Sequence, residues 1–577
     1  MAVFGERFIL GFTSPRSPYL IQEYIKVIDK NKMDDIPYNK SFQEKFYKFL
    51  SKAQVAGEMA GNAKDKALAG RDKLTRMPQA LGFFITQKGQ NFKVTEAGKL
   101  LEDSALFEDV LLHQMLKYQL PSCLHRERNT NKGYFKIKPF LELIRLVNVL
   151  EYLTYKEMLI FGMTLTNYNR FEETVNKIKQ YRVDRKKIKK QKKSLKRFDY
   201  ETQLNLFTNL YKDIIDSGNI ETRESKTKTA EEYMKKKMSN WNDYTDSIFR
   251  ILRASGIFVF TKGRSLSISP NRQNEVDYML THIKRDIEPV DMSRKDFDEY
   301  ISNPYIPQLL NDNKTNLISS LKKLGGSGSL DDTIYMLKHN LSQKREESRQ
   351  LKLAKKQSSL KVRSRQDIDD IIDVFNDITN NNIEPASMRP TLFEWNVWRA
   401  MTMINHGNIR GNFIVDDSGM PVSTASGGQS DIVGEYSNFN IGVEVTLSKG
   451  KKQYEMESEP VTRHIGEMQI KKPSFGIFIA DKLQESVINH FYTVSHQNSR
   501  IYNGIVDIIP MDTKTFIDFF KQAIQKDLHP EELFSIHEFS KLISKQMLLD
   551  EKTEVDWHAA VLKKAFKVTS IGTNNIK

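Results

Sequence analysis

The sequence predicts a multidomain protein that is mainly α-helical in front and ends in an α/β domain built on a central mixed sheet. Three observations predict this architecture: the length of 577 residues, a charge balance that changes sign along the chain, and a strand order near the end that differs from the helix-rich front. A chain of this length exceeds one ordinary core, so roughly three or four domains are expected. The 39% hydrophobic and 10% aromatic content is sufficient to build such cores.

The positive charge of the chain is concentrated before residue 366. Residues 1–365 hold 67 Lys and Arg against 44 Asp and Glu, a net charge of +23, whereas residues 366–577 hold 21 against 29, a net charge of −8. Neutralisation of phosphates by basic side chains supplies most of the sequence-independent affinity for nucleic acid. DNA or RNA is therefore the favoured partner of the front part. A soluble basic protein without such a partner is the alternative.

Cysteine content and hydropathy limit the cellular compartments that are expected for the protein. The single cysteine, Cys123, excludes internal disulfides and a cysteine-built zinc site. No apolar run approaches the roughly 20 residues that a membrane span needs, and residues 1–20 lack the apolar stretch of a secretion signal. We therefore expect a cytoplasmic protein without a membrane partner.

Two segments far apart in the sequence share a hairpin pattern. Residues 81–96 (LGFFITQKGQNFKVTE) and 255–270 (SGIFVFTKGRSLSISP) align without a gap, with matching glycines, phenylalanines and Lys-Gly pairs. Each pairs an aromatic, β-prone half-strand with a second half-strand across a turn, which is typical of a hairpin. Helix-compatible sequence follows each segment, and an amphipathic run, residues 244–252, precedes the second.

This order of helix, hairpin and helix resembles the winged-helix modules of DNA-binding proteins, in which the hairpin contacts the backbone or the minor groove. Two winged-helix-like modules would lengthen the footprint enough to read a short site. Lys88, Lys262 and Arg264 at the hairpin tips are the candidates for phosphate contact. Ordinary hairpins whose glycines merely form turns are the alternative.

The segments between these patterns predict the domain boundaries. The basic tract 181–197 is either a solvated helix or loop, or a contact to the DNA backbone. The Gly-Ser cluster in residues 321–330 indicates a flexible joint, and the charged, helix-favouring residues after it indicate a connector. The expected domains are two DNA-recognition subdomains, a helical connector and a C-terminal α/β domain, at 1–150, 151–290, 291–365 and 366–577.

The last third of the chain contains the pattern of a small mixed α/β sheet. Alternating or continuous apolar runs bounded by turn residues predict strands, and longer amphipathic runs predict helices. The expected helices are residues 392–404 and 456–468, and the expected strands are 412–416, 430–436, 439–446, 475–480 and 505–510.

Two carboxylates fall on neighbouring strands of this predicted sheet. Asp431 opens one strand, and Glu444 lies among apolar residues of the next. Burying a carboxylate is unfavourable unless something compensates, and a cation is the obvious candidate. Two such oxygen ligands, together with the carbonyl of Val445 and water, would suit Mg²⁺. Two isolated surface acids are the alternative.

Several short motifs follow one another along the chain. The run Met456 to His464 (MESEPVTRH) is the most specific of them. The others, in chain order from the front, are residues 14–18, 95–99, 117–122 with His125, 392–395, 429–431, 442–446, and 444–450 with Gln453. Together these motifs resemble the AlwI family of type IIS restriction endonucleases, which includes a nicking endonuclease, and the PD-(D/E)xK nuclease core. Residues 366–577 are therefore expected to be a nuclease domain.

The resemblance implies four active-site acids: Glu394, Asp431, Glu444 and Glu457. Asp431 and Glu444 would be direct ligands of Mg²⁺. Glu394 and Glu457 would act through water, or would be plain surface acids of their helices. The resemblance also places Arg16, in the motif near the start, among the candidate DNA contacts.

The sequence departs from the broad nuclease pattern at one position. The lysine expected two residues after Glu444 is Thr446. The attacking water must then be activated by the metal or by another side chain that enters the site. Glu457 is the favoured side chain. Arg463 could steady a phosphate, and His464 is either a site residue or a helix-packing residue. The other side chains that could compensate are Lys449, Lys451 and Gln453.

The function implied is that of a type IIS restriction endonuclease or a strand-specific nicking endonuclease. It would bind a short asymmetric site in double-stranded DNA and cleave outside that site. Because one nuclease core cuts one strand, a double-strand break would need a second nuclease subunit or a transient homodimer. A catalytically inactive DNA-binding regulator and a nuclease acting on structured RNA are the alternatives.

Overall fold

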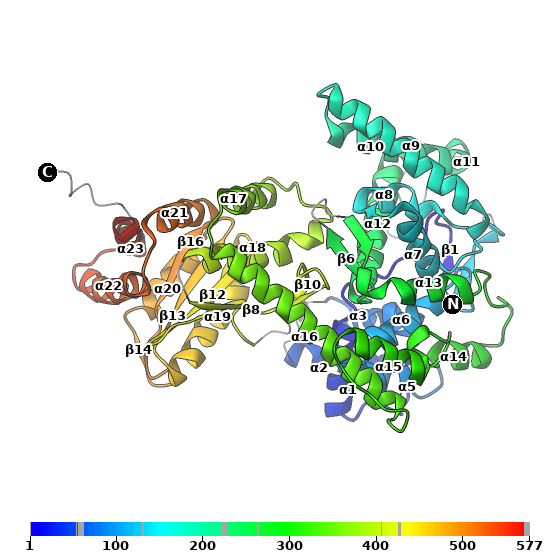
Figure 1. Cartoon of the computed structure of the whole chain (residues 1–577), viewed down its shortest axis with the longest axis horizontal. Helices are drawn as coiled ribbons and strands as arrows, with labels where there is room; N and C mark the ends of the chain where they lie inside the picture. The colour runs from blue at the N-terminus through cyan, green and yellow to red at the C-terminus, as the bar shows by residue number, and fades with distance from the viewer. Residues whose placement is uncertain are drawn as a thin grey trace. The chain divides into compact units, whose positions relative to one another are not determined.

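The computed structural model divides the chain into two compact units (Figure 1). Unit 1 comprises Met1–Arg349 and Asp416–Met420, and unit 2 comprises Gln350–Val415 and Pro421–Lys577. Within the described residues, no helix is both long and apolar enough to cross a membrane. The structure describes residues 2–53, 55, 63–129, 132–218, 220, 229–261, 265–404, 407–424 and 428–569.

Unit 1 repeats one order of elements: a helix, an extended segment, two further helices and a hairpin. In the first module the extended segment is Pro37, which bridges Asn91 just before β3. The strands β2 and β3 pair antiparallel. The elements of this module are α1 (Leu20–Lys30), α2 (Lys40–Lys52), α3 (Lys66–Thr75), β2 (Phe84–Ile85) and β3 (Lys93–Val94).

The second module has the same order, and its extended segment, β5, pairs with the second hairpin strand to give the sheet order β5-β7-β6. An insertion of three helices separates its second and third helices: α9 (Phe171–Lys190), α10 (Leu195–Leu210) and α11 (Lys212–Asp216). The elements of this module are α7 (Pro139–Leu150), β5 (Leu153–Thr154), α8 (Tyr155–Ile160), α12 (Ala230–Ala254), β6 (Phe258–Thr261) and β7 (Ser265–Ile268).

The sequence match between the two hairpins has a backbone cause. Gly82 and Gly256, which align, both have positive φ, +77° and +72°. A Cβ atom on Gly82 would lie 2.1 Å from the carbonyl oxygen of Ile301, and one on Gly256 would lie 2.1 Å from Oε2 of Glu108. Glycine therefore meets both a conformational and a steric need before each hairpin.

The remaining elements of unit 1 are mostly helical, and the basic tract 181–197 lies at the junction of two of them. They are β1 (Ala2–Phe4), which pairs with β4 (His125–Glu127), and the helices α4 (Met77–Ala80), α5 (Glu96–Leu101), α6 (Phe107–Lys117), α9 (Phe171–Lys190), α10 (Leu195–Leu210), α11 (Lys212–Asp216), α13 (Gln273–His282), α14 (Arg294–Ser302), α15 (Lys314–Lys323) and α16 (Ile334–Leu360).

The Gly-Ser segment connects α15 to α16 inside unit 1. Leu317 and Leu321 of α15 pack with Leu337 and Leu341 of α16 in one buried cluster. The segment between them is therefore the turn of a helical hairpin. The chain passes from unit 1 to unit 2 within α16, between Arg349 and Gln350.

A buried network of ion pairs holds distant parts of unit 1 together. Glu108 of α6 accepts Arg349 of α16 at 2.7 Å and Arg272, next to α13, at 3.1 Å. Arg349 also binds Asp417 at 2.8 Å, and Asp417 accepts the hydroxyl of Ser269 at 2.5 Å. The short segment Asp416–Met420 is thereby fixed within unit 1.

Unit 2 is built on a five-stranded mixed sheet of order β16-β13-β12-β11-β8. The pairs β8–β11 and β11–β12 are antiparallel, and β12–β13 and β13–β16 are parallel. The strands are β8 (Asn408–Gly411), β11 (Ile432–Glu435), β12 (Asn440–Thr446), β13 (Ser474–Ala480) and β16 (Ile508–Asp512). Two short ladders join β9 (Phe413–Val415) to β10 (Pro421–Thr424) and β14 (Asn498–Ser499) to β15 (Gly504–Ile505).

Helices cover this sheet (Figure 1). The helix α18 contacts β12 and β8, α21 contacts β13 and β16, and α19 contacts β12 and β13. Gly442 of β12 faces α19, since a Cβ atom there would lie 2.3 Å from Cδ1 of Ile465. The helices are α17 (Arg365–Thr379), α18 (Arg389–Ile404), α19 (Lys451–Lys471), α20 (Glu485–Val494), α21 (Thr513–Lys526), α22 (Pro530–Leu549) and α23 (Glu554–Thr569).

Candidate active site

Asp431 and Glu444 occupy facing positions on two adjacent strands. Ile432 of β11 pairs with Val443 of β12 in an antiparallel register, which places Asp431 opposite Glu444. Oδ2 of Asp431 accepts the backbone N–H of Val445 at 2.8 Å. The carboxylate that precedes β11 is thereby tied to β12, beside Glu444.

Glu444 is a buried carboxylate on the face of β12 that α19 covers. It alternates with Gly442 and Thr446 along the strand, so these three residues share one face. Nδ1 of His464, on α19, lies 2.9 Å from its Oε1. Burial raises the pKa of Glu444 to about 8, against the opposing hydrogen bond from Ser430.

Glu457 approaches the same strand from α19. Its Oε1 accepts the hydroxyl of Thr446 at 2.7 Å and the hydroxyl of Ser448 at 3.0 Å. Both donors lie where β12 ends and the loop to α19 begins. Two hydrogen bonds to one oxygen fix the carboxylate near the end of the strand.

Glu394 reaches the cluster from α18, a helix whose residues 391–404 are all buried. Its Oε2 is a buried atom without a hydrogen-bond partner among the described residues. Burial raises the pKa of Glu394 well above its ordinary value, and the charges of Asp431, Glu444 and Glu457 raise it further. The four predicted acids, drawn from four separate elements, therefore act on one another electrostatically.

The same mutual repulsion acts on Asp431. Burial raises its pKa well above the ordinary value, the charge of Glu444 adds to the effect, and the N–H of Val445 opposes it.

Among the described residues, only Asp109, His113 and Asp312 of unit 1 offer three ligand atoms all within 4.8 Å of one another. No three of the four acids are drawn together that closely.

The unit 1 trio forms part of an ion-pair cluster. Nζ of Lys338 lies 2.7 Å from Asp109 and 2.6 Å from Asp312, and Nε2 of His113 lies 3.0 Å from Asp312. Lys338 lies between the two carboxylates and thus already occupies the position that a cation would take.

The side chains considered as substitutes for the missing lysine have other partners. Nζ of Lys449 binds Asp481 at 2.6 Å, and Lys451 binds Glu455 at 3.2 Å. Gln453 is fully buried and donates to the carbonyls of Ser448 and Lys482. Its contacts are those of a residue that shapes the loop after β12.

Two further candidates, on α19, are close enough to influence the acids. The positive charge of Arg463 acts on Glu444 to lower its pKa, against the dominant effect of burial. His464 contacts Glu444 directly. Ser448, which also holds Glu457, was not among the residues that the sequence indicated. The Thr-x-Ser spacing at the end of a strand that carries a glutamate could have suggested it.

The predicted DNA contacts have different surroundings. Lys88 is exposed in the turn between β2 and β3. Lys262 and Arg264 lie outside the described residues. Arg16 is half exposed, and its guanidinium lies 3.4 Å from Asp243.

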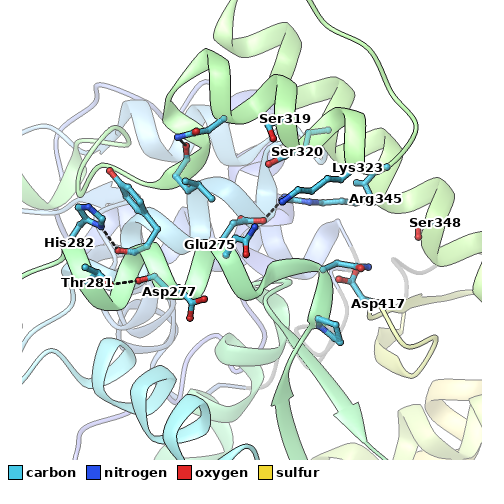
Figure 2. A pocket seen from close by; sticks show the side chains of 18 residues that line it. Glu275, Asp277, Thr281, His282, Ser319, Ser320, Lys323, Arg345, Ser348 and Asp417 are labelled. Atoms are coloured by element: carbon cyan, nitrogen blue, oxygen red, sulfur yellow. Dashed lines mark hydrogen bonds and ion pairs between the residues drawn. The ribbon is translucent and has the colours of Figure 1, made fainter.

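Unit 1 also contains a cavity of about 720 Å³ that includes none of the predicted site residues. It lies between α13, α15 and α16, and its lining is rich in Asn and Ser (Figure 2). Figure 2 shows the ion pair between Glu275 and Arg345 along one wall and His282 at one end. This cavity belongs to unit 1, whereas the four acids belong to unit 2.

Carboxylates gathered on adjacent strands can hold the metal ions that many enzymes use to hydrolyse phosphodiester bonds. The family model of the AlwI restriction endonucleases matches residues 79–519, which is more than half of the chain. The chain belongs to the AlwI restriction endonuclease family. It is therefore a restriction endonuclease, a nuclease that acts on DNA.

Two solved structures match over nearly their whole length. The small subunit of the heterodimeric restriction endonuclease R.BspD6I is 25% identical, over 34% of this chain and 98% of that chain, with a TM-score of 0.27. The binding domain of the endonuclease BpuJ1, solved with pyrene- and phenanthrene-modified DNA, is 15% identical over 52% of this chain and 98% of that chain, with a TM-score of 0.33. Neither TM-score establishes a common fold. No curated protein sequence matches the chain.

Proposed function

We propose that this restriction endonuclease is of type IIS. It binds a short asymmetric site in duplex DNA through unit 1 and hydrolyses a phosphodiester bond outside that site through unit 2, with Mg²⁺ as cofactor. The observation that carries the proposal is the placement of Asp431 opposite Glu444 on adjacent strands, with Glu457 held at the end of the same strand and Glu394 near enough for the charges of the other three to raise its pKa.

The residues present fit a divalent cation. Oε2 of Glu394 is buried without a partner, and three of the acids have pKa values raised by burial and by one another. A cation would relieve both costs, and carboxylate oxygens are the ligands that Mg²⁺ prefers. Asp431 and Glu444 are the proposed direct ligands, with the carbonyl of Val445 as a third.

Each acid has a distinct part in this proposal. The bound cation would supply charge neutralisation at the phosphate and a lowered pKa for water. Asp431, held by the N–H of Val445, and Glu444, held by His464, keep two oxygens at fixed positions. Glu457, fixed by Thr446 and Ser448, orients the attacking water and accepts its proton. Arg463 steadies the phosphate.

Recognition is assigned to the two modules of unit 1. Helix, strand, helix, helix, hairpin, with the first strand paired to the last, is the order of a winged-helix domain, and it supports winged-helix modules here. In such domains the helix before the hairpin enters the major groove. The corresponding helix is α3 in the first module, where the four-residue α4 separates it from β2, and α12 in the second.

One set of four acids can hydrolyse one strand at a time. The product of the isolated chain is therefore expected to be a nick at a fixed distance from the site. A double-strand break would need a second nuclease core, supplied by a separate subunit or by a transient homodimer.

The test is incubation of the protein with supercoiled plasmid, with Mg²⁺ or with EDTA, followed by sequencing of the ends. Nicked circles with discrete ends in Mg²⁺ alone support the proposal. Cleavage of structured RNA but not of the plasmid would indicate an RNA nuclease, and binding without cleavage would indicate an inactive regulator.

Variants of the acids sharpen this test. Asp431→Asn and Glu444→Gln should abolish cleavage while leaving binding of the duplex unchanged. Glu467→Gln is the matched control for Glu457→Gln, because Glu467 is an exposed acid on the same helix. Full activity of Asp431→Asn or Glu444→Gln would show that the proposed active site is wrong.

A further inference from the structure

Three helices, α9 to α11, are inserted into the second module of unit 1 between α8 and α12, and the first two of them form a pair. The helices α9 and α10 are neighbours (Figure 1), and Tyr181 stacks on Phe198 with ring centroids 5.6 Å apart. Asp199 accepts the hydroxyl of Tyr181 at 2.5 Å and Nε of Arg185 at 3.0 Å. These contacts join the two helices into one arm, residues 171–210.

The arm is fixed to the module that carries it. Arg182 of α9 donates to both oxygens of Glu157, at 2.8 and 3.0 Å, and to the carbonyl of Tyr152 at 2.6 Å. Its guanidinium also lies 3.9 Å from the centroid of the Tyr152 ring. Glu157 is the capping-box residue of α8, so the arm is anchored on a helix of the module itself.

The arm ends in a basic tip, residues 186–197. Eight of its twelve residues are Lys or Arg and none is acidic, and all eight basic residues are exposed. Lys187 pairs with Asp184, and Arg197 pairs with Glu201. The other six make no ion pair with any residue in the described ranges: Lys186, Lys189, Lys190, Lys192, Lys193 and Lys196.

Helix stability explains only part of this charge. Basic residues near the C-terminus of α9 complement the helix macrodipole. Lys196 and Arg197, however, lie in the first turn of α10, where positive charge opposes the macrodipole and where no acid is present. The tip therefore carries charge that lowers the stability of its own helix, and an external anion would offset that cost.

We infer that the basic tip binds the phosphate backbone of duplex DNA outside the recognised sequence, as a sequence-independent contact. This inference rests on the proposed function of unit 1 in DNA recognition. A rigid, anchored arm with unpaired cations on an exposed tip suits a regular array of phosphates, because both partners present their charges at fixed positions.

The size of the tip agrees with such a contact. At 1.5 Å per residue, the eight residues that follow Arg182, up to Lys190, extend α9 by about 12 Å beyond its anchor. Duplex DNA presents one phosphate charge per about 1.7 Å of its axis, so this length faces about seven charges. Several of the six unpaired lysines can contact phosphates at once.

The test compares a four-lysine tip variant with a matched control in the full-length protein. The tip variant replaces Lys189, Lys190, Lys192 and Lys193 with Gln. The control replaces four exposed lysines on α21 to α23 with Gln, and thus makes the same charge change in unit 2: Lys514, Lys521, Lys545 and Lys563. Binding is measured in EDTA against a long and a short duplex of arbitrary sequence, over a range of NaCl concentrations.

The expected result is a weaker salt dependence of binding for the tip variant on the long duplex. Each lost phosphate contact lowers the slope of log Kd against log[NaCl] by about 0.9. Loss of two to four contacts therefore weakens binding about 30- to 900-fold near physiological salt. The control variant keeps the wild-type slope, and replacement of the same four tip lysines with Arg keeps it too.

Three outcomes are distinguishable. If the wild type cuts plasmid and the tip variant binds the long duplex as the control does, the inference about the tip is wrong and the proposed function stands. If the wild type neither cuts nor binds duplex DNA, the proposed function is wrong, and the inference that rests on it is wrong with it. If the tip variant loses affinity for structured RNA but not for duplex DNA, the tip serves a different partner and the inference is also wrong.

Discussion

The hydroxyl of Thr446 donates a 2.7 Å hydrogen bond to Oε1 of Glu457. Thr446 lies two residues after Glu444, the position at which the resemblance of the sequence to the PD-(D/E)xK pattern predicts a lysine. In this chain that position therefore orients an acid on α19 and supplies no positive charge. Glu457 is correspondingly held at the end of β12, on the same face as Glu444.

Thr446→Val should lower the cleavage rate about 10- to 100-fold, because removal of a residue that orients a functional side chain typically costs this much. Thr446→Ser keeps the hydroxyl and should keep most of the rate. Single-turnover nicking assays measure both. Since Thr446 is a positioning residue, the Kd for duplex DNA should be unchanged, and an unchanged rate in Thr446→Val would contradict its role.

Replacement of Lys449 or Lys451 with Ala should leave the nicking rate within about threefold of the wild type, because each lysine is exposed and pairs with an acid outside the four, and ion pairs of exposed lysines contribute little. These acids are Asp481 for Lys449 and Glu455 for Lys451. A large rate loss in Lys449→Ala, without a change in DNA binding, would show that this lysine leaves Asp481 during the reaction.

The strands of unit 2 could largely be predicted from the sequence, because their apolar patterns are strong. Residues 475–480 form a continuous apolar run, and they form β13 (Ser474–Ala480). The prediction of a single strand over residues 505–510 is less accurate, because the segment divides between two ladders. Ile505 pairs with β14, and Ile508 begins β16. Asp507 between them is buried and forms hydrogen bonds with His537 and Ser540. No local sequence pattern reveals these contacts.

The contacts within the site depend on packing between elements and could not be predicted. His464 was equally compatible with a packing role, because its contact with Glu444 requires α19 to lie across β12 at one particular rotation. Lys449 was a candidate for the site because of its position in sequence, yet its partner Asp481 follows a different strand, β13. The positions of Asp431 and Glu444 could be predicted more readily, since strand alternation and register determine them.

The ion network of unit 1 predicts how its stability depends on pH. Burial alone would raise the pKa of Glu108, but the charges of Arg349 and Arg272 outweigh it and lower the pKa to about 2. Because this pKa is depressed in the folded state, the stabilisation is present above the ordinary value near 4.5 and is lost as the pH falls toward 2. Unit 1 should therefore become less stable in that range.

Glu108→Gln should remove this part of the pH dependence and destabilise unit 1 by about 2–4 kcal/mol at neutral pH, because two buried guanidinium groups lose a shared partner. Calorimetry at several pH values measures both effects. Glu299→Gln is a suitable control, since Glu299 is exposed on α14. A neutral-pH stability equal to the wild type would mean that Arg349 and Arg272 are satisfied without Glu108.

Lys196→Glu should stabilise α10 while weakening DNA binding. Glutamate in the first turn complements the macrodipole and relieves repulsion from Lys192 and Lys193, which is worth about 0.3–1 kcal/mol. Amide hydrogen exchange within α10 should slow about two- to fivefold as a result. Lys196→Gln removes the repulsion alone and should give a smaller effect. Faster exchange in Lys196→Glu would mean that Lys196 stabilises the arm, and the charge of the tip would then have a structural origin.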